Sequence, residues 1–97
     1  AVAHEVGHFV DWCTFVYGDK DVLKEFKPIM EKEFDAAIID KIYYTHYDED
    51  EISEYWADSF ANCVSECDAV IEYYKTYCPD TYRFVWEVIE ALPDIQN

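Results

Sequence analysis

The sequence predicts an all-α domain of four to five helices. Apolar residues recur at intervals of three and four through most of the chain, which is the period of an amphipathic helix. No alternation of apolar and polar residues runs for longer than four positions, so the pattern predicts no strand. The chain has 97 residues, 52% of them hydrophobic and 19% aromatic. Residues 1–97 are therefore expected to form one domain with a single modest core.

The first helix is predicted over residues 1–17. Its apolar stripe follows a 4-3-4-3 spacing and consists of Val2, Val6, Phe9, Cys13 and Val16. The opposite side carries two histidines among aromatic residues, so we expect this helix to be covered on both sides. Gly18 is a natural end for it.

Two shorter helices and a connection are expected next. Residues 21–26 are interpreted as helical, and Pro28 fits the first turn of another helix that runs to about residue 42. Residues 43–51 are polar and rich in aromatic side chains, and we interpret them as a loop.

The longest helix is predicted over residues 51–77. Trp56 and Phe60 belong to its apolar face. Glu54 and Asp58 lie one turn apart on the other face, where small residues follow them and would permit the close approach of another helix.

A last helix is expected to reach about residue 92. The pair Cys78-Pro79 should end the long helix, and Asp80 is placed to cap the next one. The core stripe of this last helix consists of Val85, Val88, Ile89 and Leu92.

The charge of the chain limits its partners. Asp and Glu number 22 against 7 Lys and Arg, which gives a formal net charge of −15. Such a charge repels nucleic acid and anionic membranes and favours basic peptides. The longest apolar runs are too short to cross a bilayer. The chain has no initiator Met and begins inside the first helix, so we expect a piece of a longer protein; its oligomeric state is not predicted.

The cysteines admit two interpretations. An even number in a short chain is compatible with disulfides, but buried reduced thiols are also common. The four are Cys13, Cys63, Cys67 and Cys78. We favour reduced thiols, and because no Cys-x-x-Cys pair occurs we expect no zinc role for them.

The residues His4-Glu5-Val6-Gly7-His8 match the H-E-x-x-H pattern of helical zinc sites. On a helix, His4 and His8 project from one face one turn apart, so both imidazoles can reach one Zn²⁺. Glu5 lies beside them, where it can take a proton from a water molecule held at the metal. The pattern predicts metal-assisted hydrolysis, provided that the rest of the chain supplies a third ligand.

Glu54 is the best candidate for that third ligand, with Glu51 as its rival in the preceding turn. A helix that presents Glu54 opposite the two histidines would complete a His₂Glu set. Asp58, one turn later, could then accept the second N–H of His4 and fix its tautomer. Asp11, three residues after the second histidine, is a further candidate for a similar role.

The oxyanion of a peptide-bond transition state needs a hydrogen-bond donor besides the metal. The connection before the Glu54 helix supplies two side chains, His46 and Tyr47. We expect the phenol of Tyr47 to be the donor, and we interpret His46 as a structural or surface residue.

Three tracts carry a resemblance to a known family. Residues 3–11, the tract from Tyr47 through residues 54–60, and residues 78–84 resemble the lethal factor-like gluzincin metallopeptidases. This group includes the catalytic domain of anthrax lethal factor and the clostridial Pro-Pro endopeptidases. The resemblance covers nearly all of the chain, in order and with similar spacing.

The resemblance implies a role for each matching residue. It implies zinc on His4, His8 and Glu54, and Glu5 as general base and acid. Tyr47 stands seven residues before the glutamate ligand, the offset of the family's transition-state tyrosine, and Asp58 stands at the family's acidic position four residues after it.

The same resemblance limits what the chain can be. Catalytic domains of the family have a β-sheet before the motif helix, and its edge strand binds the substrate peptide. That part is absent from this sequence, so we expect the helical C-terminal half of a zincin-type domain, which cleaves peptides poorly by itself. Substrate preference is not implied. Family members are often secreted toxins or exported peptidases, which implies export by analogy.

The sequence thus predicts a zinc-dependent endopeptidase that acts on a peptide or protein substrate. A non-enzymatic acidic module that keeps a zinc scaffold and binds a basic partner is the alternative. A zinc-free helical bundle with a chance motif is a third interpretation.

Overall fold

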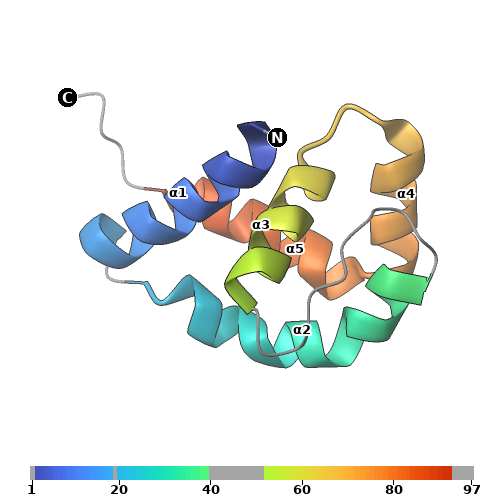
Figure 1. The fold of residues 1–97 in the computed structure, drawn as a ribbon, viewed down its shortest axis with the longest axis horizontal. Helices are drawn as coiled ribbons and strands as arrows, with labels where there is room; N and C mark the ends of the chain where they lie inside the picture. The colour runs from blue at the N-terminus through green and yellow to red at the C-terminus, as the bar shows by residue number, and fades with distance from the viewer. Residues whose placement is uncertain (1, 19, 40–51, 93–97) are drawn as a thin grey trace.

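The computed structural model describes residues 2–18, 20–39 and 52–92, and this part of the chain is entirely helical apart from short connections. Its helices are α1 (Val2–Gly18), α2 (Val22–Ile39), α3 (Ile52–Cys63), α4 (Asp68–Tyr77) and α5 (Pro79–Glu90). The all-α fold class predicted from the sequence is confirmed. In Figure 1, α3 lies in the middle, α1 and α4 lie on either side of it, and α2 passes beneath. Each of the other four helices packs against α3.

The core lies where α2, α3 and α5 meet, and aromatic rings build most of it. The Phe26 ring stacks on Tyr55 with centroids 5.6 Å apart and on Phe84 at 5.8 Å, and it meets Trp56 edge-on at 5.4 Å. Phe26 and Trp56 are completely buried. Ring pairs at these separations stabilise a core beyond the apolar area that they bury. The cluster fixes the position of α3, the helix that presents the acidic residues singled out above.

The contact between α1 and α3 depends on Gly7. A Cβ added at this position would lie 3.0 Å from Ala57 Cα and 3.1 Å from Phe60 Cβ, so the two helices approach more closely than a larger residue would allow. The indole N–H of Trp56 donates to the Gly7 carbonyl oxygen at 2.8 Å, in a buried contact. The glycine of the H-E-x-x-H pattern therefore lets the histidine helix lie directly against α3.

The prediction that a helix ends before Pro28 is wrong. The helix α2 runs through Pro28, because Val22, Phe26 and Met30 lie four residues apart and are all completely buried. Burial of this stripe outweighs the loss of one backbone hydrogen bond at the proline. The carbonyl that loses its partner belongs to Lys24, an exposed residue.

The single helix predicted over residues 51–77 is also wrong. The helix α3 ends at Cys63 and α4 begins at Asp68. Between them the Ser65 hydroxyl accepts the backbone N–H of Cys67 at 2.8 Å. Serine side chains offer the backbone this local alternative to helix, and the chain turns here so that α4 can pack on α5.

The predicted cap at Asp80 is wrong as well. The helix α5 begins at Pro79, and the side chain of Glu33, from α2, accepts hydrogen bonds from its first turn. The Asp80 N–H donates to Glu33 at 2.9 Å, the Thr81 N–H at 2.8 Å and the Thr81 hydroxyl at 2.7 Å. Asp80 instead pairs with Lys32 and Arg83.

The apolar stripe predicted for the first helix does not face the core. The buried side of α1 is formed by Gly7, Val10 and Thr14, and Gly7 lies directly against α3. The outer face of α1 is defined by Val2, Val6, Phe9, Cys13 and Val16, and all of these except the half-buried Cys13 are exposed, Val2 by 80%. The expected covering on both sides is thus wrong for the described residues. None of the described helices is both long and apolar enough to cross a membrane.

None of the four cysteines, all of which lie in the described part of the chain, forms a disulfide. Cys63 and Cys78 are buried, and burial is the main reason why the pKa of the Cys63 thiol lies well above its ordinary value. A thiol held protonated in an apolar core is chemically inert, so Cys63 acts as a packing residue.

Candidate metal centre

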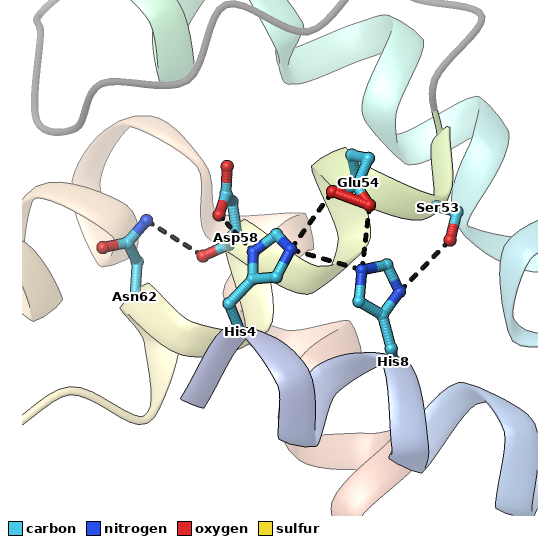
Figure 2. A network of polar contacts seen from close by, with 6 residues as sticks. All are labelled: His4, His8, Ser53, Glu54, Asp58 and Asn62. Carbon is cyan, nitrogen blue, oxygen red and sulfur yellow. Dashed lines mark hydrogen bonds and ion pairs between the residues drawn. The ribbon is translucent and has the colours of Figure 1, made fainter. Parts of the chain in front are cut away.

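Two helices present the candidate site from opposite sides. His4 and His8 project from one face of α1, one turn apart, and Glu54 and Asp58 project toward them from α3, also one turn apart (Figure 2). The i, i+4 spacing on both helices produces this arrangement once Gly7 has brought the helices together.

Three side chains converge on one point between the helices. The Nε2 atoms of His4 and His8 lie 3.2 Å apart. One oxygen of Glu54 lies 3.1 Å from His4 Nε2, and its other oxygen lies 2.9 Å from His8 Nε2 (Figure 2). The structure thus brings together His4, His8 and Glu54, the three residues that the sequence analysis proposes as ligands.

One ligand atom from each of the three side chains lies within 4.8 Å of the others, which is close enough for the three to hold one metal ion. Nitrogen and oxygen ligands about 2.0–2.2 Å from a tetrahedral zinc lie about 3.3 Å from each other. The two Nε2 atoms are 3.2 Å apart, close to that value, and each faces a different oxygen of Glu54. Two imidazoles and one carboxylate are also the ligand set of catalytic zinc with an open position for water.

The contact between His4 and Asp58 leaves Nε2 of His4 facing the other two side chains. Its Nδ1 donates to the Asp58 carboxylate at 2.6 Å. When the only ring proton is on Nδ1, the imidazole presents a lone pair at Nε2, and the Glu54 oxygens also carry lone pairs. In that form the cluster can hold a metal ion, whereas protons on the Nε2 atoms would turn the same contacts into hydrogen bonds to Glu54.

Asp58 is held in place from two sides. Its side chain is mostly buried, its Oδ1 accepts from His4, and its backbone oxygen accepts the Asn62 amide at 2.9 Å. Burial raises the pKa of Asp58 above its ordinary value, whereas the hydrogen bond with His4 and the charge of His4 lower it. Asp58 therefore contacts Nδ1 of His4, the atom through which a carboxylate could orient a metal-binding imidazole.

Ser53 is a site residue that the sequence analysis missed. Its hydroxyl lies 3.3 Å from Nδ1 of His8 (Figure 2). Ser53 directly precedes Glu54 in α3, so one turn of helix carries both a candidate ligand and a partner for the second imidazole. The only signal in the sequence is that adjacency, and serine is too common for adjacency alone to single it out.

Asp11 and Glu5 also lie on α1. Asp11 is half-buried, and its pKa is raised by burial and by the charge of Asp21 and lowered by the charge of His8. The hydrogen-bond partner at Nδ1 of His8 is Ser53, so Asp11 acts on this imidazole through charge. The Glu5 side chain is exposed, in the same turn as the first histidine.

Tyr47, His46 and the rival ligand Glu51 lie outside the described residues. A scan against protein-family models and searches of the curated proteins and of the solved structures found no match to this chain. The functional argument therefore rests on the geometry of the α1–α3 site, and the resemblance to lethal factor-like peptidases stays a proposal.

Proposed function

We propose that this chain binds Zn²⁺ through His4, His8 and Glu54. The observation that carries the proposal is the convergence of three lone-pair donors from two helices, with separations of 2.9–3.2 Å. The Nδ1 atoms of the two imidazoles engage different partners, Asp58 and Ser53, which leaves both Nε2 atoms to face the common point. Zinc content measured on the purified protein, with metal stoichiometry near one, is the direct test.

We further propose a zinc-dependent endopeptidase of the lethal factor type. When bound, the metal supplies Lewis-acid chemistry and makes water a stronger acid. In this proposal Glu5 takes one proton from the attacking water and returns it to the nitrogen of the leaving amine. Its exposed side chain, in the turn that carries the first histidine, leaves it accessible to a substrate. Tyr47 would donate a hydrogen bond to the carbonyl oxygen as that oxygen gains charge.

The replacement Glu5→Gln tests the activity separately from the metal. The amide cannot accept the proton, so we expect peptide turnover to fall by about 10²- to 10⁴-fold, the usual contribution of a general acid–base group. Zinc stoichiometry should not change, because Glu5 is not a ligand. The assay is cleavage of a peptide library by the longest natural form of the protein that contains this chain. Full turnover by the Glu5→Gln variant would contradict the assigned base.

The second candidate function is a zinc-stabilised module that binds a basic partner. The net charge of −15 favours it, because such a surface attracts lysine- and arginine-rich peptides. Zinc binding without cleavage of any library peptide, together with salt-sensitive binding of a basic peptide, would favour this module. Cleavage that depends on Glu5 would exclude it as the main function.

A further inference from the structure

The two imidazoles of the site have different partners at Nδ1. His4 contacts a carboxylate, Asp58, at 2.6 Å, whereas His8 contacts a hydroxyl, Ser53, at 3.3 Å (Figure 2). We propose that Ser53 is the positioning residue for His8, which sets its tautomer and ring orientation for metal binding. This inference rests on the proposed zinc site and assigns a role to a residue outside its ligand set.

The tautomer argument gives the direction of the hydrogen bond. A histidine can bind a metal through Nε2 only when Nε2 carries a lone pair, so the ring proton must sit on Nδ1. His8 Nε2 is the atom that faces Glu54 and the other histidine. His8 Nδ1–H must therefore donate, and the Ser53 oxygen must accept. The reverse direction, with the serine as donor, would put the proton on Nε2 and remove one ligand.

The position of Ser53 links ring orientation to the ligand helix. Ser53 and Glu54 are consecutive in the first turn of α3, so the backbone that places the carboxylate also places the hydroxyl. Both ends of the imidazole of His8 are thus held by one short segment: Nδ1 by Ser53 and Nε2 next to Glu54. A ring fixed at both nitrogens loses little rotational freedom when it binds a metal.

The chemical difference between the two partners predicts unequal effects. A charged acceptor forms a hydrogen bond roughly twice as strong as a neutral one, and the Asp58 contact is also shorter. Loss of an outer partner commonly lowers metal affinity by about 10- to 100-fold. We expect Ser53→Ala to lie near the lower end of that range and Asp58→Ala near the upper end.

The experiment measures the Zn²⁺ affinity of the full chain by competition with a chelator. Ser53→Ala removes the acceptor, and Ser53→Thr keeps a hydroxyl at the same position. Ser65→Ala is the matched control, because its hydroxyl accepts a backbone N–H in the connection after α3 and contacts neither histidine. Two further readouts are the visible spectrum of the Co²⁺-loaded protein and the thermal unfolding of the metal-free protein.

The proposal expects Ser53→Ala to weaken Zn²⁺ binding about 10-fold and to change the Co²⁺ spectrum, and Ser53→Thr to restore both. The thermal unfolding temperature of metal-free Ser53→Ala should stay close to that of the metal-free parent. Ser65→Ala should bind zinc with the affinity of the parent. Equal zinc affinity in Ser53→Ala and the parent would overturn the inference and leave the zinc site standing. Loss of affinity that follows a matching loss of metal-free stability would overturn it in favour of a structural role. A parent protein that binds no zinc would remove the proposed function and this inference together.

Discussion

Two carboxylates each bridge a pair of helices, and they do so in opposite chemical ways. Glu33 of α2 is 6% exposed and accepts three hydrogen bonds from the first turn of α5. Glu54 of α3, whose side chain is 38% exposed, faces the Nε2 atoms of His4 and His8 on α1. The first carboxylate meets donors alone, and the second meets imidazole nitrogens that can carry lone pairs.

This difference distinguishes a carboxylate surrounded by donors from one that faces candidate metal ligands. Glu33 is buried and accepts three hydrogen bonds from N–H and O–H groups in the first turn of α5. The two oxygens of Glu54 each face one imidazole Nε2, which can carry either a proton or a lone pair, and the partly exposed side chain is open to solvent. The identity of the partner atoms, rather than charge alone, therefore makes Glu54 the better candidate for a metal ligand.

The largest predicted effect is the loss of metal binding in Glu54→Ala. Removal of one of the three proposed ligands should lower zinc affinity by more than about 100-fold, beyond the loss expected for an outer partner. The free energy of unfolding of the metal-free protein should change by less than about 1 kcal/mol, because the Glu54 side chain and its contacts with the histidines are partly exposed. Chelator competition measures the zinc affinity, and thermal unfolding measures the stability. An unchanged zinc affinity in Glu54→Ala would show that Glu54, like Glu33, is not a metal ligand.

Glu33→Ala should lower the stability of the protein and leave its zinc affinity unchanged, the reverse of the result expected for Glu54→Ala. Thr81 is completely buried, so its N–H and hydroxyl would lose their acceptor without access to water. We expect the free energy of unfolding to fall by on the order of 3 kcal/mol. The zinc affinity of the folded variant should equal that of the parent.

Glu31 provides the matched control for this measurement. It lies in the same helix two residues earlier and is exposed. Glu31→Ala should change stability by no more than about 0.5 kcal/mol. Equal effects at positions 31 and 33 would show that the α5 contacts of Glu33 contribute nothing.

A smaller effect is predicted for Gly7→Ala, and it couples stability to the site. The new Cβ would lie 3.0 Å from Ala57 Cα and 3.2 Å from Ala57 O, which are backbone atoms and must shift. Overpacking of this kind costs about 1–3 kcal/mol. The helices α1 and α3 would move apart, so zinc affinity should fall as well. A variant that is as stable as the parent and binds zinc equally well would show that close approach of the helices is not required.

The sequence was sufficient for the parts of the site that follow helical spacing. His4 and His8 share one face of a helix, as do Glu54 and Asp58, and a four-residue spacing predicts both pairs without knowledge of the fold. The pairing of the two helices was predicted from ligand chemistry and from the family resemblance. The distances between the donors could not come from spacing, because they depend on how closely α1 packs on α3.

The remaining features depend on contacts that the local sequence pattern does not specify. Glu33 accepts from Thr81, which is 48 residues away, so no local pattern marks it as a cap. The break after Cys63 depends on Ser65, whose side chain can bond either to water or to the backbone. Ser53 was missed for the same reason, because its role is defined by the position of His8 on another helix.

The smallest predicted effect concerns the outer face of α1, where the sequence periodicity was assigned to the wrong side. Periodicity shows that the two faces of a helix differ, but not which face its neighbours cover.

Val2 is 80% exposed and Val10 is 6% exposed. Val2→Ala should therefore change the free energy of unfolding by less than about 0.5 kcal/mol. Val10→Ala, the same replacement on the same helix, should cost about 1–2 kcal/mol, because it removes buried methyl groups and leaves a cavity against α3. Thermal unfolding of the two variants measures the contrast directly. A larger loss at position 2 than at position 10 would mean that α1 packs through its outer face, and the histidines would then no longer point at Glu54.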